Sequence, residues 1–287
     1  MTAFKADIYA WHPSGPVRRI SAGDGVYYQA CIRPDGAMVT YAGAGSGPPR
    51  IWCAGTDGTV APEPLTPAES GARHPVFSAD GARIAFTSDR CSGAASQTVA
   101  EMNGGGAPTH GNIFVMGSDG AGVVQLTDGP YVDQRPCFTR DGSRVLFVSN
   151  RAGRGLTLWA AAVDGSGAVE PLPYRGPAYR PWFSIDGEWL FFFRDMDGRH
   201  QICRLRPADE QFEPLPNDDD GNSHGPFADP AGKTLLMHST RGGGGYRLWE
   251  LPLDGTPPTR LEVPGYERPT HGTRGRNGMV TFDVCGR

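Results

Sequence analysis

The sequence predicts an all-β fold, a six-bladed β-propeller whose blades are four-stranded antiparallel sheets. Three observations predict it: a hairpin pattern that recurs at a fixed spacing, an excess of turn residues, and an N-terminal hairpin that supplies what the last repeat lacks. The 287 residues include 41 Gly and 26 Pro, well above average usage and without a collagen-like period. This composition indicates many turns between short strands.

The recurring hairpin is clearest in residues 74–90, HPVFSADGARIAFTSDR. Asp80-Gly81 separates two short apolar runs, and this dipeptide favours a tight turn because glycine accepts a positive φ. The second strand of each hairpin ends on a large residue, and successive intervals are 45, 61, 45, 45 and 45 for Tyr41, Phe86, Phe147, Phe192, Met237 and Phe282. A period near 45 with four strands per unit is typical of propellers.

Two outer strands are expected after each of the first five hairpins, but the chain ends directly after the sixth. The N-terminal hairpin, residues 7–21, is therefore expected to pair with residues 268–285 and complete the last blade. This closure would remove free sheet edges and make residues 1–287 one domain. A β-sandwich is the alternative, although sandwiches rarely repeat at fixed spacing.

Composition also limits the class of function. The net charge of −4 and the lack of a basic stripe argue against nucleic-acid binding. No apolar run is long enough to enter a membrane, so we expect a soluble protein that acts as a monomer. The N-terminus has no signal-peptide pattern, which predicts a cytoplasmic protein, or a periplasmic one if an export signal was removed. The six cysteines lack metal-ligand spacing and are expected to be reduced core residues.

The hairpins resemble the repeat family of TolB-type propellers, whose motif is approximately P-x-[FW]-S-P-D-G-x-x-[IL]-[AV]-[FY]-x-S-x-R. The match is close in 74–90 and 135–151, good in 180–193, and weaker in 225–241 and 268–284. The resemblance implies the fold rather than the function. Related propellers are partner-binding modules in TolB, gating domains in prolyl-oligopeptidase-like enzymes and the tricorn protease, and whole enzymes in oligogalacturonate lyase.

A site is expected where the inner strands begin, around a central funnel on the face opposite the Asp-Gly turns. The candidate ligand-binding residues there are Gln29, His74, Asp133, Arg135, Arg180, His224, Glu267 and Arg268. Guanidinium groups bind carboxylates and phosphates through paired hydrogen bonds. We therefore expect a peptide, a protein segment or a small anionic ligand in the funnel. Alternatively, these residues pair with neighbouring blades and line a hydrated funnel.

A metal-dependent carbohydrate-active enzyme is the second functional hypothesis. The binding hypothesis needs no cofactor, whereas imidazole and carboxylate groups at the funnel could hold calcium, manganese or zinc, with His74 and His224 as ligands. The resemblance to oligogalacturonate lyase implies such a cluster, for which His271 and Gln29 are further candidates. No G-x-S-x-G motif or P-loop is present, so no catalytic residue is assigned and the non-catalytic hypothesis is preferred.

Two loops are expected on the funnel face. An insertion at residues 91–111 accounts for the long interval and is expected to overhang the funnel, with Glu101, Asn103 and His110 as contact residues. The acidic run Asp218–Asp220 is interpreted as a solvated loop rather than a calcium loop, because it lacks the alternating ligand positions of an EF-hand.

Overall fold

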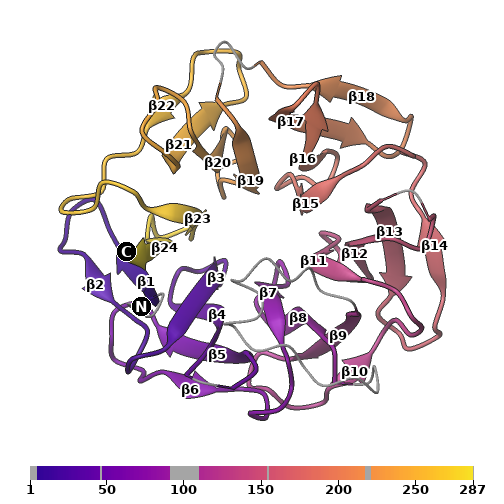
Figure 1. Cartoon of the computed structure of the whole chain (residues 1–287), viewed down its shortest axis with the longest axis horizontal. Helices are drawn as coiled ribbons and strands as arrows, with labels where there is room; N and C mark the ends of the chain where they lie inside the picture. The colour runs from indigo at the N-terminus through magenta and orange to yellow at the C-terminus, as the bar shows by residue number, and fades with distance from the viewer. Residues whose placement is uncertain (1–4, 46, 91–109, 154, 217–220, 287) are drawn as a thin grey trace.

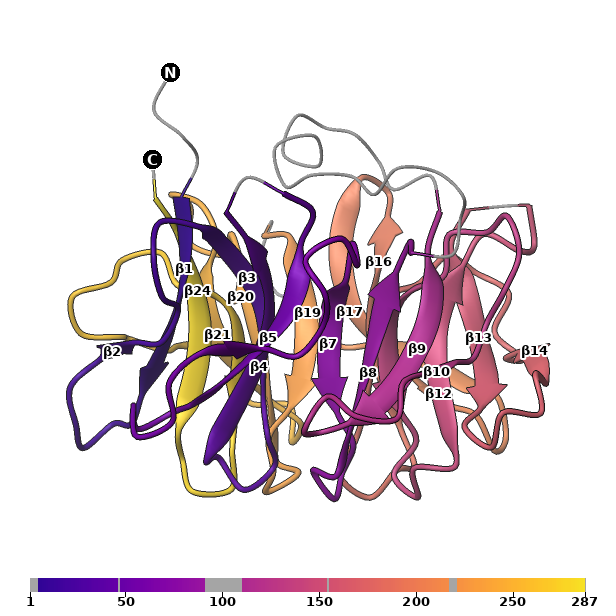
Figure 2. The ribbon, with the colours of Figure 1, turned by 90° about the horizontal axis from the view of Figure 1, so that it is seen from below.

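All regular secondary structure in the described residues is β-strand, and the strands form sheets arranged around a central axis (Figure 1). The computed structural model describes residues 5–45, 47–90, 110–153, 155–216 and 221–286. Seen from the side, the strands run between the two faces of a disc (Figure 2). The described residues include no helix that could span a membrane. The structure is therefore the predicted all-β propeller with four-stranded antiparallel blades.

Four sheets contain four consecutive strands each. The first comprises β7 (Arg73–Phe77), β8 (Arg83–Ser88), β9 (Asn112–Gly117) and β10 (Val124–Gln125). The second comprises β11 (Gln134–Phe138), β12 (Arg144–Ser149), β13 (Thr157–Ala162) and β14 (Val169–Pro171). The third comprises β15 (Tyr179–Phe183), β16 (Leu190–Met196), β17 (Arg199–Arg206) and β18 (Gln211–Pro214). The fourth comprises β19 (Ser223–Ala228), β20 (Thr234–Ser239), β21 (Arg247–Pro252) and β22 (Thr259–Arg260).

The remaining sheet has eight strands and joins the two ends of the chain. Its first half comprises β23 (Thr270–Arg274), β24 (Val280–Gly286), β1 (Lys5–Trp11) and β2 (Arg18–Arg19). Its second half comprises β3 (Val26–Ile32), β4 (Met38–Ala44), β5 (Arg50–Gly55) and β6 (Glu63–Pro64). A single parallel bridge between Ala6 and Val26 connects the halves. The count of six blades stays a prediction, because it depends on dividing this sheet at that bridge.

The predicted closure of the ring is confirmed by the pairing of β1 with β24. The two strands are antiparallel, with Ile8 opposite Asp283 and Trp11 opposite Val280, and β2 pairs with β1 on the outer side. Figure 2 shows β1 and β24 side by side. The bridge from β1 to β3 was not predicted, and it ties the first and last hairpins into one sheet.

The hairpin turns explain the recurrence of Asp-Gly. In the second hairpin, Asp80 accepts hydrogen bonds from Ser78 Oγ at 2.5 Å and from the Ala82 N–H at 3.0 Å. Gly81 follows with a φ of 72°, which glycine adopts at little cost. The apolar residues of neighbouring sheets pack against one another, as Phe86 and Phe114 do against Cys31 and Ile51. The turns and this packing place the beginnings of the inner strands around the axis.

Candidate functional site

A β-bulge interrupts each inner strand at the same point. Pairing shifts between Tyr28 and Cys31 in β3 and at the equivalent points of β7, β11, β15, β19 and β23. The first residue within each bulge has a φ between 51° and 59°, and these residues are Gln29, His74, Arg135, Arg180, Gly225 and His271. A residue with a side chain strains the backbone by about 1–3 kcal/mol in this conformation, which recurs mainly at functional sites.

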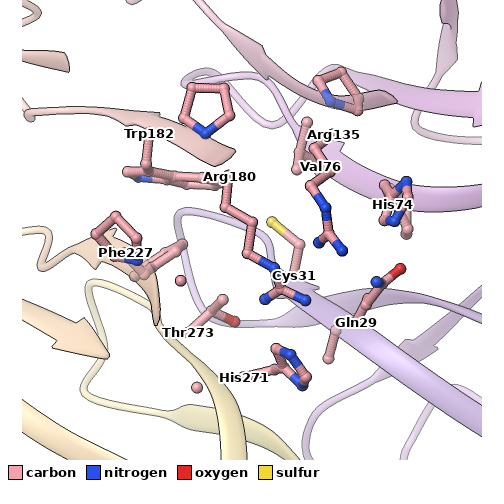
Figure 3. A pocket seen from close by; sticks show the side chains of 17 residues that line it. Gln29, Cys31, His74, Val76, Arg135, Arg180, Trp182, Phe227, His271 and Thr273 are labelled. Carbon is pink, nitrogen blue, oxygen red and sulfur yellow. The ribbon is translucent and has the colours of Figure 1, made fainter. Parts of the chain in front are cut away.

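The bulge residues line a pocket on the axis, and Figure 3 shows their side chains converging. The pocket is a cavity of about 90 Å³, enough for several water molecules or a small polar group. Its remaining wall is largely apolar and includes Val76, Trp182 and Phe227, together with prolines that follow four of the bulge residues. A charged group in such a pocket loses much of its hydration.

Arg135 and Arg180 extend into this pocket with their guanidinium groups close together (Figure 3). Within the described part of the chain, neither side chain donates a hydrogen bond or forms an ion pair. Burial lowers the pKa of Arg135 well below its ordinary value, and the neighbouring Arg180 lowers it further. Burial also lowers the pKa of Arg180 to about 10, an effect that the Asp283 charge partly offsets. The pocket therefore holds two partly buried cations without a direct counter-ion in the described residues.

The Asp283 carboxylate is the charge that partly offsets the effect of burial on the pKa of Arg180. Its two oxygens, however, already form hydrogen bonds with other residues. His271 Nδ1 lies 2.9 Å from both of them, Thr270 Oγ1 donates a hydrogen bond over 2.5 Å, and the Gln29 N–H donates another over 3.1 Å. Burial raises the pKa of Asp283, but His271 and these hydrogen bonds outweigh it, so the pKa is lower than usual. Asp283 is therefore an ionised group that orients His271.

A row of histidine rings leads from His271 away from the pocket. The ring centroids of His271 and His238 are 4.4 Å apart, those of His238 and His224 are 5.3 Å apart, and those of His224 and His200 are 4.5 Å apart. Burial is the main cause that lowers the pKa of His238 and His271, and it lowers that of His224 to about 3. His74 has a lowered pKa for the same reason. His74, His224, His238 and His271 are therefore neutral at pH 7.

Gly225 occupies the bulge position at which the other inner strands carry a long side chain. A Cβ added there would lie 2.9 Å from His238 Cε1 and 3.1 Å from Arg180 Nη1. Real Cβ atoms essentially never approach another heavy atom as closely as the first of these distances, and the second is tighter than most Cβ contacts, so a side chain would displace His238 and press on Arg180. Glycine at this position thus leaves the space in which Arg180 and His238 lie.

The structure brings four of the predicted site residues together. Gln29, His74, Arg135 and Arg180 line the pocket, as expected. Asp133 does not: it is buried and accepts hydrogen bonds from Arg151 Nη2 and Ser149 Oγ, both at 2.6 Å. Asp133, which directly precedes β11, therefore forms a structural ion pair with Arg151.

The predicted position of His224 needs a correction. His224 precedes the bulge residue of β19, so its side chain points away from the pocket lining. Its ring stacks on Phe193 with centroids 4.5 Å apart, and it hydrogen-bonds to His200 and to the Tyr246 hydroxyl, the latter at 3.3 Å. The predicted metal ligands His74 and His224 therefore lie in different surroundings.

On the sixth inner strand, Arg268 was predicted to face the funnel, whereas His271 lines the pocket. Glu267 and Arg268 are exposed and precede β23, and His271 holds the bulge position. The prediction matched Pro269 to the proline of the other hairpins, whereas the residue after this bulge is Gly272. The spacing from Phe282 was the better signal, because counting back by the interval of the other hairpins leads to within one residue of His271.

No group of three or more His, Cys, Asp or Glu side chains is placed to hold a metal ion among the residues that the structure describes. A divalent cation thus stays an untested expectation. The insertion residues Glu101 and Asn103 and the run Asp218–Asp220 lie outside the described residues. His110 is described, and its carbonyl accepts a hydrogen bond from Arg73 Nη2 at 3.3 Å.

Comparison with known proteins identifies the family to which the chain belongs. A family model described as the TolB beta propeller domain matches residues 107–270, more than half of the chain. The chain belongs to the TolB β-propeller family. No curated protein matches it by sequence.

Solved structures agree with this TolB-family fold. A putative TolB from Agrobacterium tumefaciens is similar with a TM-score of 0.75 at 17% identity, over 99% of each chain. TolB from Acinetobacter baumannii gives 0.62 at 17% identity, over 97% of this chain and 63% of that one. An oligogalacturonate lyase in complex with manganese gives 0.59 at 12% identity, over 97% and 79%. At these identities the likeness shows the fold alone.

Proposed function

We propose that this TolB-family propeller is a non-catalytic binding protein that takes an anionic group of a peptide, protein segment or small molecule into its axial pocket. The observation that carries the proposal is the pair of partly buried guanidinium groups, Arg135 and Arg180, without a direct counter-ion in the described structure. A buried charge is costly unless it is paired. A bound anion would supply that pairing.

The chemistry of the pocket favours an oxyanion. Two adjacent guanidinium groups can each direct two N–H donors at a carboxylate or phosphate. An anion between them would also reduce the repulsion that lowers the pKa of Arg135. The apolar wall formed by Val76, Trp182 and Phe227 lowers the polarity around a bound anion, which strengthens such charge-assisted hydrogen bonds. The five strained bulges hold the donors in place before the ligand arrives.

The alternative, a metal-dependent carbohydrate-active enzyme, has less support. It rests on the fold likeness to the manganese-bound lyase, while the described side chains offer no three-ligand group. Elemental analysis of protein purified without chelators separates the two proposals. Stoichiometric manganese, calcium or zinc that is lost in a His74→Ala variant would favour the enzyme.

Calorimetric titration with acetate, succinate and inorganic phosphate tests the binding proposal. We expect at least one of these anions to bind the wild-type protein at one site per chain. The double variant Arg135→Gln/Arg180→Gln should lose this binding, whereas Arg140→Gln, which removes an exposed guanidinium outside the pocket, should retain it. Binding that survives in the double variant, or its absence for every anion in all three proteins, would overturn the proposal.

A further inference from the structure

We infer that the ligand of the axial pocket is the C-terminus of a polypeptide, held by its terminal carboxylate and its last amide group. This inference rests on the proposed function, because it assigns the anion to a particular chemical class. Three features of the pocket carry it: the paired guanidinium donors, an unsatisfied acceptor beside them, and an apolar wall.

The unsatisfied acceptor is Gln29 Oε1. This oxygen is buried, and no hydrogen-bond donor reaches it from the described residues. Figure 3 shows the Gln29 side chain at the edge of the pocket, with its end group near Arg135 and His74. A buried carbonyl oxygen without a donor costs free energy comparable to a lost hydrogen bond, so the ligand that completes the pocket should carry an N–H or O–H donor.

A second acceptor comes from His271. Its Nδ1 faces the Asp283 carboxylate, which can only accept, so this nitrogen carries the proton. Because the ring is neutral, Nε2 is an acceptor. The pocket therefore combines guanidinium donors for an anion with two acceptors for a donor. Acetate lacks that donor, whereas the last residue of a polypeptide has an amide N–H two bonds from its carboxylate.

A free amino acid fits less well than a peptide. Its ammonium group would enter the field of Arg135 and Arg180, two cations that lack a direct counter-ion in the described structure. Like charges at short range in an apolar pocket repel strongly. An acylated nitrogen keeps the donor and removes the charge, which selects a chain end over a free amino acid.

The apolar wall accommodates the last side chain. Cys31, Trp182 and Phe227 line the pocket and also line a second cavity of about 100 Å³. The lining of that cavity includes Phe77, Phe138, Phe183 and Ile185. Cys31, Trp182 and Phe227 thus lie between two adjacent spaces, and arginines such as Arg140 also line the second one. Because the aromatic and aliphatic side chains lie next to the guanidinium pocket, we expect an apolar residue such as leucine at the chain end.

Calorimetric titration with N-acetyl-glycyl-leucine, its C-terminal amide and acetate tests this inference on the full chain. The free acid should bind about 10-fold or more tightly than acetate, and amidation should weaken binding about 10- to 100-fold, the range for hydrogen bonds to charged groups. If acetate binds through Arg135 and Arg180 but the acid binds no tighter or the amide binds equally well, the C-terminal assignment is wrong and the proposed function stands. If none of the three binds while succinate or phosphate does, the C-terminal assignment is again wrong; if no anion binds at all, the proposed function fails as well.

A Gln29→Met variant tests the amide contact separately. Methionine keeps the length of the side chain without the acceptor, so affinity for N-acetyl-glycyl-leucine should fall about 3- to 10-fold, as for loss of one neutral hydrogen bond. Affinity for acetate should not change. The ester analogue that replaces the last amide N–H with oxygen should bind wild type and variant equally. An equal loss for acetate and peptide would show a structural role for Gln29 and overturn the assigned contact.

Discussion

Arg135 and Arg180 each combine backbone strain with desolvation of a charge. Their φ values are 57° and 52°, and burial lowers the pKa of both. Neither cost is offset by a hydrogen bond or ion pair within the described residues. Residues of this kind stabilise a complex at the expense of the free protein, the usual relation between binding sites and stability.

An Arg135→Gln substitution should therefore stabilise the ligand-free protein. The variant removes an uncompensated charge and keeps the side-chain bulk, and we expect the free energy of unfolding to rise by about 0.5–2 kcal/mol. Urea unfolding at pH 7.5 without added anions measures this. Exposed Arg140→Gln is the matched control, and its stability should stay within about 0.5 kcal/mol of wild type. A clear loss of stability in Arg135→Gln would show that its cation is compensated.

The histidine row predicts a stability that falls in mild acid. His224, His238 and His271 have lowered pKa values in the folded protein, so below pH 6.5 the unfolded chain binds more protons and stability decreases. The loss begins near the unfolded pKa of 6.5 and for His224 continues towards its folded pKa of about 3. Burial is the largest cause of this lowered pKa, and the charges of His200, Arg180, His271 and Arg135 lower it further.

A His224→Phe variant tests that interpretation. Phenylalanine can keep the stacking on Phe193 without a titrating group. Between pH 7.5 and 5.5 the variant should lose about 1 kcal/mol less stability than wild type, a value reduced for partial exposure. Urea unfolding at the two pH values gives the difference. Equal losses in both proteins would mean that His224 titrates normally in the fold.

At the residue scale, the sequence predicted part of the site. Arg135 and Arg180 were found because each precedes a proline at the start of a strong hairpin. The prediction that Arg268 lines the funnel was wrong, because Pro269 is not the counterpart of those prolines. Asp283 and His238 could not be found, since both lie in second strands whose side-chain directions depend on the bulge opposite them. A bulge has no reliable sequence signal when, as at Gln29-Ala30, no proline marks it.

The hairpin is the element that positions the site. Asp-Gly turns set one end of each hairpin, and the bulges set the other, so that one residue per inner strand faces the axis. The turns were predictable because their chemistry is local. The outer strands were predictable only approximately, since β6, β10 and β22 are two residues long and are defined by pairing rather than by an apolar pattern.

The hairpin of β19 and β20 depends on the small size of Gly225, so Gly225→Ala should lower both the stability of the protein and its affinity for anions. Alanine at a φ of 59° is strained, and its Cβ would collide with His238 and Arg180. Gly165→Ala is the matched control, because Gly165 has a φ of 77° and open space around its Cβ position. The control should lose about 1 kcal/mol from backbone strain alone.

Gly225→Ala should lose at least about 1 kcal/mol more than the control, and its affinity for acetate should fall because Arg180 is displaced. Thermal unfolding and calorimetric titration measure the two effects. A loss no larger than that of Gly165→Ala, with normal binding, would show that Arg180 and His238 do not depend on the space left by Gly225.

For the whole molecule, the pairing of β1 with β24 holds the ring closed. Ile8 is fully buried and packs with Tyr27 and Tyr41 of the next hairpin, so it links both ends of the chain to one core. The fixed 45-residue spacing made the ring predictable. The bridge between Ala6 and Val26 was not predictable, because a single parallel contact leaves no pattern in the sequence.

Ile8→Ala should therefore destabilise the whole protein by about 2–5 kcal/mol, the range for a large-to-small change in a core. Val60→Ala is the control, since Val60 is 42% exposed and should change stability by less than about 0.5 kcal/mol. Urea unfolding should show one cooperative transition in each protein. A loss below about 1 kcal/mol for Ile8→Ala would mean that closure contributes little to the fold.

The central claim, that Arg135 and Arg180 together bind an oxyanion on the axis, is tested most directly by NMR of protein labelled with ¹⁵N in its arginine guanidinium groups. Arg135→Gln and Arg180→Gln assign the two resonances, and N-acetyl-glycyl-leucine is then titrated into the wild-type protein. We predict that these two resonances shift together and saturate, while that of Arg175, which is exposed and lines neither cavity, stays in place. Small shifts spread over the exposed arginines, without saturation at Arg135 and Arg180, would contradict the account.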